Sequence, residues 1–127
     1  MNTDRNLVCD QSGASVVEFA LSLTAFLMLM FGLINIARVL WIVGSLHFAA
    51  ESAARCASAN TTTCNSTTTI QSYALAKYYG ESLGGTNPFT YSTTGCGHTV
   101  TASYTYSLVI PLAGTYSLPL AATACFP

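Results

Sequence analysis

One uninterrupted apolar segment near the N-terminus constrains the fold of this chain more than any other feature. No charged residue stands between Glu18 and Arg38, and within Phe19 to Ile34 the polar interruptions are Ser22 and Thr24. As a helix with a rise of about 1.5 Å per residue, the interval is about 30 Å long, which matches the hydrocarbon core of a bilayer. The segment therefore predicts a transmembrane helix.

A secretory signal peptide is the alternative for an apolar segment in this position. It would need a basic leading segment, an apolar core of about 7–15 residues and a cleavage site with small residues. The leading residues here carry Arg5 but also Asp4 and Asp10, and residues 35–58 continue a helical pattern after the apolar segment. These features favour a retained transmembrane helix.

The helix is expected to continue beyond the membrane. No proline stands between Asn35 and Ala57, so one helix from Ala14 to Ala57 would be about 66 Å long. Its second half has apolar or small residues at i+3/i+4 spacing, which predicts one face packed against later parts of the chain. These residues are Ile34, Ala37, Trp41, Gly44 and Phe48.

The composition excludes several classes of protein. Only 7% of the 127 residues are charged, the net charge is −1 and 51% of the residues are hydrophobic, whereas about 25% of an average soluble domain is charged. This composition argues against intrinsic disorder and against a free soluble monomer. Without a basic surface to neutralise phosphates, nucleic acid is not an expected partner. The composition indicates a small protein that is membrane-anchored or forms assemblies.

The C-terminal part changes character at Ser58. Ser58 to Thr69 is rich in Ser, Thr and Asn and predicts an exposed loop, and residues 70–79 predict a short helix. Thr99 to Ile110 alternates apolar and hydroxyl side chains, which is typical of a half-buried strand. A second alternating stretch, from Leu118 to Phe126, has its Pro119 at a position that only a strand start or an edge strand tolerates.

These elements predict an α+β protein. A long N-terminal helix would pack on a small antiparallel sheet, built from a C-terminal hairpin and a possible third strand at Phe89 to Ser92. The hairpin would lay its apolar face on the amphipathic half of the helix.

The five cysteines indicate disulfides. Cys9 precedes the apolar segment, whereas Cys56, Cys64, Cys96 and Cys125 all follow it. Four cysteines on one side of a membrane suit two disulfides in an oxidising compartment and allow three connectivities. Cys56–Cys64 and Cys96–Cys125 are the favoured pairs, because they would close the loop after the helix and tie the sheet's start to its last strand.

A metal site or an active site is not expected. There is no C-x-x-C motif, and His47 and His98 lack ligand spacing to a cysteine pair. Acidic residues are too few and too scattered for a carboxylate pair, and no phosphate-binding loop or nucleophile elbow is present. We therefore expect neither enzymatic activity nor a cofactor.

Glu18, at the start of the apolar run, has two interpretations. A carboxylate in lipid costs about 2.5–3.5 kcal/mol at the bilayer centre and less near the interface. It can lie at headgroup depth in the first turn of a helix, where it complements the macrodipole. Alternatively, the stretch Gly13 to Phe19 resembles the processing site of type IV pilins, in which a polar leader ends at Gly and a Glu is the fifth residue of the mature chain.

The following residues resemble the TadE-like family, which comprises minor pilins or pseudopilins of the Tad (Flp) tight-adherence pilus. The resemblance covers about Gly13 to Ala57. It is carried by Gly13-Ala14, Val17-Glu18-Phe19-Ala20-Leu21, Phe31-Gly32-Leu33-Ile34, Ala37-Arg38, Trp41 and Ala49-Ala50 with Ala53-Ala54-Arg55. The Cys- and Thr-rich hairpin suits the variable C-terminal domain of the family.

The resemblance implies a structural role. A prepilin peptidase would cut between Gly13 and Ala14, and Glu18 and Phe19 would serve subunit assembly, with Glu18 paired to the N-terminal amine of a neighbour. Residues 1–13 would be a cytoplasmic leader, 14–57 the long helix with its first half in the membrane, and 58–127 an exported α+β domain.

The implied partners are the prepilin peptidase, the major Flp-type pilin, other minor pilins, the inner-membrane assembly platform and membrane lipid. The implied location is the bacterial inner membrane with a periplasmic domain, the extracellular pilus, or both, and the role includes adhesion. Two alternatives remain: a single-pass membrane protein with an uncleaved leader whose periplasmic domain binds a ligand or protein, and a major filament subunit.

Overall fold

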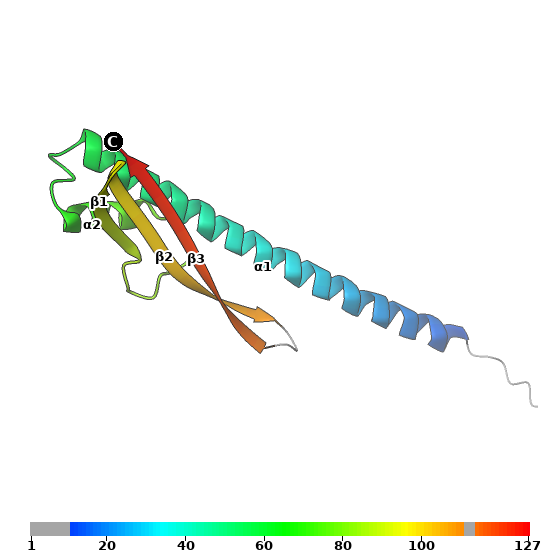
Figure 1. Cartoon of the computed structure of the whole chain (residues 1–127). Coiled ribbons are helices and arrows are strands. Elements are labelled where there is room, and N and C mark those ends of the chain that lie inside the picture. The colour runs from blue at the N-terminus through cyan, green and yellow to red at the C-terminus, as the bar shows by residue number, and fades with distance from the viewer. Residues whose placement is uncertain (1–10, 111–113) are drawn as a thin grey trace, which may run out of the picture. The chain divides into compact units, whose positions relative to one another are not determined.

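The computed structural model describes residues 11–110 and 114–127. The described elements are the helices α1 (Gln11–Ala59) and α2 (Thr67–Lys77) and the strands β1 (Phe89–Thr94), β2 (Gly97–Ile110) and β3 (Gly114–Phe126), as Figure 1 shows. The chain divides into an N-terminal unit that ends at Asn35 and a C-terminal unit, Ile36–Pro127. The predicted α+β class is confirmed.

The N-terminal unit contains the apolar part of α1. Every side chain from Gly13 to Ile34 is exposed, and the helix is long and apolar enough to cross a membrane, with a mean hydropathy of 2.2 over its most apolar window. Thr24 Oγ1 donates a hydrogen bond to the Ala20 carbonyl oxygen (2.8 Å), and Asn35 Nδ2 donates one to Phe31 (2.9 Å). Because these polar groups are satisfied within the helix, they suit an apolar surrounding.

The helix α2 begins three residues earlier than the sequence analysis expects. Ser66 caps it, since its side chain accepts a hydrogen bond from the Thr69 backbone N–H while the Thr69 side chain accepts one from the Ser66 N–H. This reciprocal arrangement satisfies two backbone donors that a helix start leaves open. Ile70 and Ala74 point into the core from this helix.

The three strands form one antiparallel sheet in the order β1-β2-β3. Ala102 of β2 lies between Phe89 and Ala122, so small and large apolar side chains share one face. Pro119 lies on β3, an edge strand, opposite Thr105, which is where a residue without a backbone N–H is tolerated. The expected hairpin, the third strand and the edge position of Pro119 are all found.

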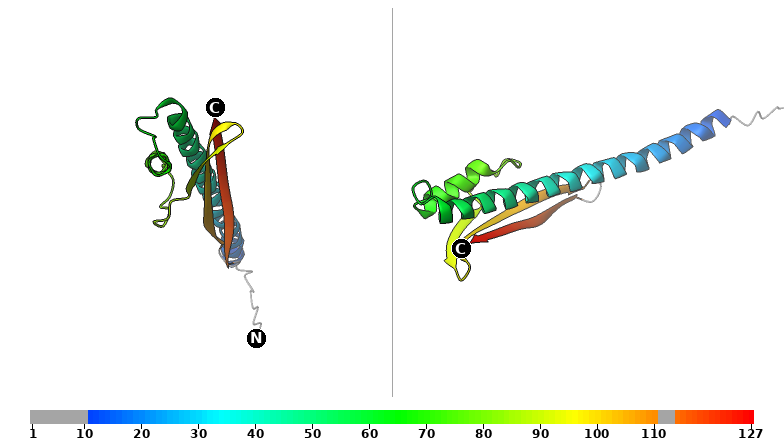
Figure 2. Two further views of the ribbon diagram at one scale, coloured as in Figure 1. Left: turned by 60° about the vertical axis from the view of Figure 1, so that its left-hand side comes forward. Right: turned by 90° about the horizontal axis from the view of Figure 1, so that it is seen from above.

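The core of the C-terminal unit lies between the sheet and residues 36–59 of α1, along which the β2–β3 hairpin runs (Figure 2). The sheet contributes the alternating residues that the sequence analysis identifies, among them Val100, Tyr106 and Leu120. The helix contributes two large side chains and a set of small ones. These are Ile42, Leu46, Ala49, Ala50, Ala53, Ala54 and Ala57.

The predicted buried face of α1 is wrong. Trp41 is 66% exposed and Phe48 is 49% exposed, and Ile34, Ala37 and Gly44 are exposed as well. At about 100° per residue, the buried alanines lie on nearly the opposite side of the helix. The small side chains allow the sheet to approach the helix closely, whereas the bulky Trp41 would hold it away.

Candidate functional site

The segment that the sequence analysis proposes for processing and assembly lies in the first turns of α1. The helix begins at Gln11 rather than at Ala14, so the Gly13–Ala14 peptide bond is helical. Gly13 has no side chain or distant backbone within 4 Å of where a Cβ would lie. The first N–H groups of a helix lack intrahelical partners, and the Gly13 N–H is among them.

Glu18 and Phe19 are both exposed on this helix, Phe19 at 67%. Glu18 lies one turn after Ala14, so the two side chains share a face. The next basic residue along the chain is Arg38, about 30 Å further along the helix at 1.5 Å per residue. Within α1 the carboxylate therefore has no cation in reach.

Two disulfides link the residues that the sequence analysis pairs. Cys56 is bonded to Cys64 with a Cα–Cα distance of 5.8 Å, and Cys96 is bonded to Cys125 with a Cα–Cα distance of 6.3 Å. The first closes the loop after α1, and the second joins the start of the hairpin to its last strand. Within residues 11–110 and 114–127, no three His, Cys, Asp or Glu side chains come together as metal ligands.

The end of the sheet near Cys96 is held by side-chain contacts. The Tyr91 hydroxyl and His98 Nδ1 are hydrogen-bonded at 2.6 Å, and Thr99 Oγ1 donates to Cys125 Sγ at 3.2 Å. The Arg55 guanidinium lies 4.8 Å from the centre of the Phe126 ring, a cation–π contact between α1 and β3. His98 therefore has a structural partner, and His47 is exposed on α1.

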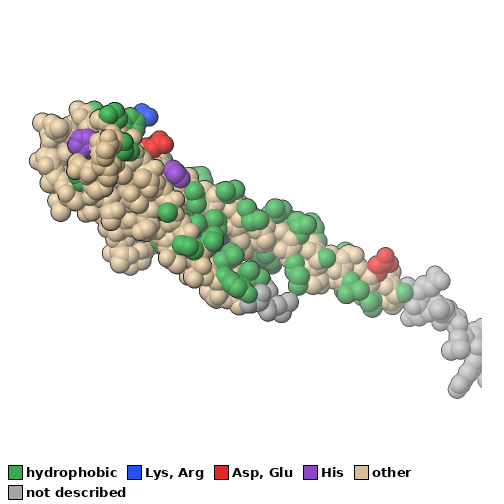
Figure 3. Space-filling model, in the orientation of Figure 1, with side chains coloured by type: hydrophobic (Ala, Val, Ile, Leu, Met, Phe, Trp, Pro, Cys, Tyr) green, Lys and Arg blue, Asp and Glu red, His purple; other side chains and the backbone are tan. Residues whose placement is uncertain are grey.

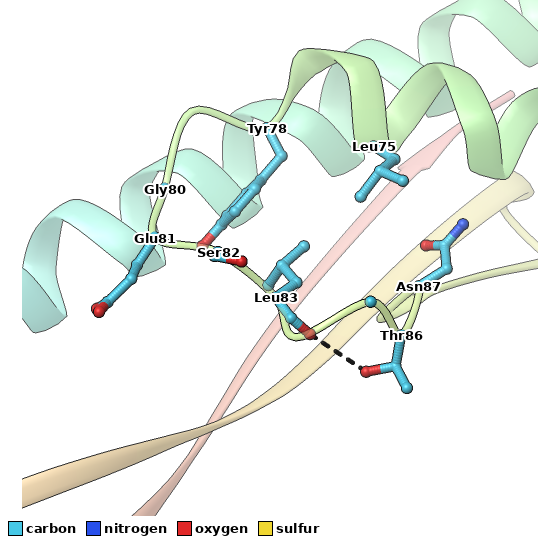
Figure 4. A pocket seen from close by; sticks show the side chains of 9 residues that line it. Leu75, Tyr78, Gly80, Glu81, Ser82, Leu83, Thr86 and Asn87 are labelled. Atoms are coloured by element: carbon cyan, nitrogen blue, oxygen red, sulfur yellow. Dashed lines mark hydrogen bonds between the residues drawn. The ribbon is translucent and has the colours of Figure 1, made fainter.

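A cavity of about 300 Å³ opens beside the loop after α2 (Figure 4). The hydroxyl of Tyr78 is buried there close to the Ser45 hydroxyl, and no hydrogen bond of good geometry to it is present among the described residues. The neighbouring Ser45 hydroxyl donates its own hydrogen bond to the Ile42 carbonyl oxygen (3.1 Å). The lining residues are Leu75, Tyr78, Gly80, Glu81, Ser82, Leu83, Gly85, Thr86 and Asn87.

The surroundings of Tyr78 disfavour its ionised form. Burial raises the pKa of the phenol above 10.0, the nearby Ser45 hydroxyl opposes that rise, and Tyr104 and Glu81 add to it. A Cβ at Gly80 would collide with the Tyr78 ring, so glycine is needed where the chain passes over it. The sequence analysis places Tyr78 within the short helix expected over residues 70–79 and assigns its hydroxyl no role.

The family comparison matches the helix that carries Glu18. TadE-like protein is the family that matches, over residues 13–55. No curated protein and no solved structure matches the chain. The TadE-like resemblance of this segment is thus confirmed, and it suggests a membrane-anchored protein associated with a Tad pilus.

Proposed function

We propose that this chain is a minor pilin or pseudopilin, a structural component in the assembly of a Tad-type pilus that contributes to adhesion. One observation carries the proposal. The TadE-like match covers an exposed helix in which Glu18 is the one charged residue between Gly13 and Ala37. A surface of this kind requires lipid or other helices around it.

The proposed maturation removes residues 1–13 by a prepilin peptidase and leaves Ala14 as the N-terminus. Residues 14–57 then serve as the long helix, anchored in the inner membrane by its first half, and residues 58–127 form the exported domain in the periplasm or on the pilus. The proposed partners are the major Flp-type pilin, other minor pilins and the assembly platform.

Glu18 has a physical role in this proposal. Alone in lipid, a carboxylate is costly, and so is the ammonium of a new N-terminus. When the Glu18 carboxylate of one subunit meets the Ala14 amine of another, each charge is neutralised by the other. The pair therefore both drives association and sets the axial register between neighbouring helices.

The test replaces Glu18 by Gln in the full chain, expressed with its native pilus system. Gln removes the charge and keeps the volume, so membrane insertion should persist. The neighbour's amine would be left unpaired at a cost of about 3 kcal/mol or more per contact, so co-purification with sheared pili or partner pilins should fall at least tenfold. Glu51→Gln, at an exposed site on the C-terminal unit, removes the same charge and should leave co-purification unchanged.

N-terminal sequencing of the same membrane and pilus fractions completes the test. Ala14 at the N-terminus supports processing as a pilin. A chain that begins at Met1 or Asn2, with normal behaviour of Glu18→Gln, would favour the single-pass anchored binding protein with an uncleaved leader. Filaments composed mainly of this chain would instead identify a major subunit.

A further inference from the structure

The end of the β2–β3 hairpin carries exposed apolar side chains. Val109 is 62% exposed, Ile110 39%, Tyr116 53% and Leu118 41%. Figure 3 shows hydrophobic side chains gathered at this end of the hairpin. Large apolar side chains that cluster in the open indicate an interaction surface, whereas isolated ones do not.

These side chains occur on both faces of the hairpin. Side chains alternate between the two faces of a strand. By this alternation Ile110 lies on the same face as the buried Val100, and Tyr116 and Leu118 lie on the same face as the buried Leu120, which is the core face. Val109 lies on the opposite face. A docked protein covers one face of a sheet, whereas lipid can contact both faces of a hairpin end.

The hairpin end lies where the C-terminal unit begins. Phe126, at the other end of β3, is next to Arg55 late in α1, and the hairpin runs back along the helix from there (Figures 1 and 2). Leu108 and Val39 both pack against the edge of the core. Two further residues in each strand extend the hairpin by about 7 Å beyond Leu108.

At this end of the C-terminal unit the hairpin carries no charged residue. The helix and the hairpin there carry aromatic residues suited to a membrane interface. No Asp, Glu, Lys or Arg follows Glu81 in the chain. Trp41 on the helix is 66% exposed beside Leu40, also 66% exposed. Trp and Tyr are enriched at the level of lipid headgroups, and Trp41 and Tyr116 are such residues on the helix and the hairpin.

We propose that the hairpin end, Leu108–Ile110 with Gly114–Leu118, inserts into the leaflet from which the C-terminal unit emerges and gives that unit a membrane contact of its own. The proposal rests on the membrane anchoring of α1. A hairpin held at the headgroup–acyl boundary orients the unit on the bilayer, since two contacts restrict rotation about the helix axis. Insertion of about 5–10 Å would bury Val109, Ile110 and Tyr116 in the apolar layer.

The test places single tryptophans in the full chain, in a Trp41→Phe background that removes the native one. The protein is reconstituted in phosphatidylglycerol–phosphatidylethanolamine vesicles with acyl chains brominated near the carbonyl end. Tyr116→Trp and Val109→Trp, on opposite faces, should each lose about half of their emission to the bromine quencher, as expected for insertion to the boundary. Thr93→Trp, exposed at the far end of the sheet, should lose almost none.

A fourth reporter separates this proposal from anchoring itself. Leu29→Trp, within the apolar helix, should be quenched whenever the helix spans the bilayer. Quenching of Leu29→Trp without quenching of either hairpin reporter would overturn the hairpin proposal and leave anchoring intact. Absence of quenching at Leu29→Trp would refute anchoring.

Coverage of the hairpin by protein would give a different result. A blue-shifted but unquenched Tyr116→Trp beside a water-exposed Val109→Trp would identify a one-sided protein contact, such as a second copy, and would reject lipid insertion. Protection of the Cys96 and Cys125 thiols from alkylation in each variant verifies that the disulfide of the sheet has formed.

Discussion

At the scale of single residues, Tyr78 is the group whose surroundings fit its chemistry least. Its ring packs against Phe89 with a centroid distance of 6.4 Å, while its hydroxyl is buried and makes no hydrogen bond of good geometry among the described residues. A buried hydroxyl that gives up water without gaining a hydrogen bond costs about 1–3 kcal/mol. The ring therefore stabilises the core, whereas the buried hydroxyl oxygen destabilises it.

Tyr78→Phe should therefore stabilise the C-terminal unit by about 1 kcal/mol. The free energy of unfolding, measured with denaturant on the protein in detergent, tests this. Tyr73→Phe, at a half-buried site on α2, is the control and should change stability by less than about 0.5 kcal/mol. A loss of stability in Tyr78→Phe would show that the hydroxyl holds a hydrogen bond.

Because the pKa of Tyr78 is raised, the difference in stability between Tyr78→Phe and the parent protein should depend on pH. Below about pH 10 the phenol is protonated in both states, so its contribution does not change. Above that pH the unfolded chain loses the proton first, and stability falls as pH rises towards the folded-state pKa. Tyr78→Phe should therefore lose less stability than the parent protein above about pH 10.

At the scale of elements, the packing of α1 on the sheet depends on small side chains. Ala49, Ala50, Ala53 and Ala54 are fully buried, so this part of the helix presents little side-chain volume to the core. Gly44 lies on the other side, with no atom of a neighbouring element within 4 Å of its potential Cβ. The two faces should respond to added volume in opposite ways.

Ala50→Leu should destabilise the C-terminal unit by about 1–3 kcal/mol, because three added carbons overpack a filled core. Gly44→Ala should stabilise it by about 0.5–1 kcal/mol, because alanine costs less backbone entropy in a helix and meets nothing there. Denaturant unfolding of both variants distinguishes the faces. A destabilising Gly44→Ala would place Gly44, and with it Trp41 and Phe48, on a packed face.

At the scale of the whole molecule, the two disulfides constrain the chain over different lengths. Cys56–Cys64 spans a sequence separation of 8 and stabilises the loop after α1. Cys96–Cys125 spans a separation of 29, and the loop that it closes contains β2 and most of β3. In the chain-entropy account, the longer loop restricts the unfolded state more. The Cys96–Cys125 disulfide should therefore contribute more to the free energy of unfolding than the Cys56–Cys64 disulfide.

Replacing Cys96 and Cys125 together by Ser should cost about 3.5 kcal/mol, and replacing Cys56 and Cys64 about 2.5 kcal/mol, by loop-closure entropy. Denaturant unfolding of the two double variants measures the difference. Alkylation without reduction, followed by intact-mass measurement, should find all four thiols protected in the parent protein. Equal losses in the two variants would contradict the entropic ordering.

Features with a local cause could be predicted from the sequence. The apolar run at Phe19 to Ile34 and the lack of proline before Ala57 predict α1, because helix formation and membrane length depend on neighbouring residues. The alternation from Val100 to Leu108 predicts β2, since side chains in a strand point to opposite faces in turn. The TadE-like motif lies in the same local pattern and is confirmed over residues 13–55.

The buried face of α1 was decided by tertiary structure alone. Its second half has apolar residues on every side, so periodicity could not choose between the stripe with Trp41 and the one with Ile42 and Leu46. The sheet packs on the side that carries Ile42, Leu46 and the alanines, where complementary side-chain volumes on the two elements fill the core. Trp41 instead donates a hydrogen bond to the carbonyl oxygen of Tyr79 (3.2 Å), 38 residues away in sequence, and no local pattern contains such a partner.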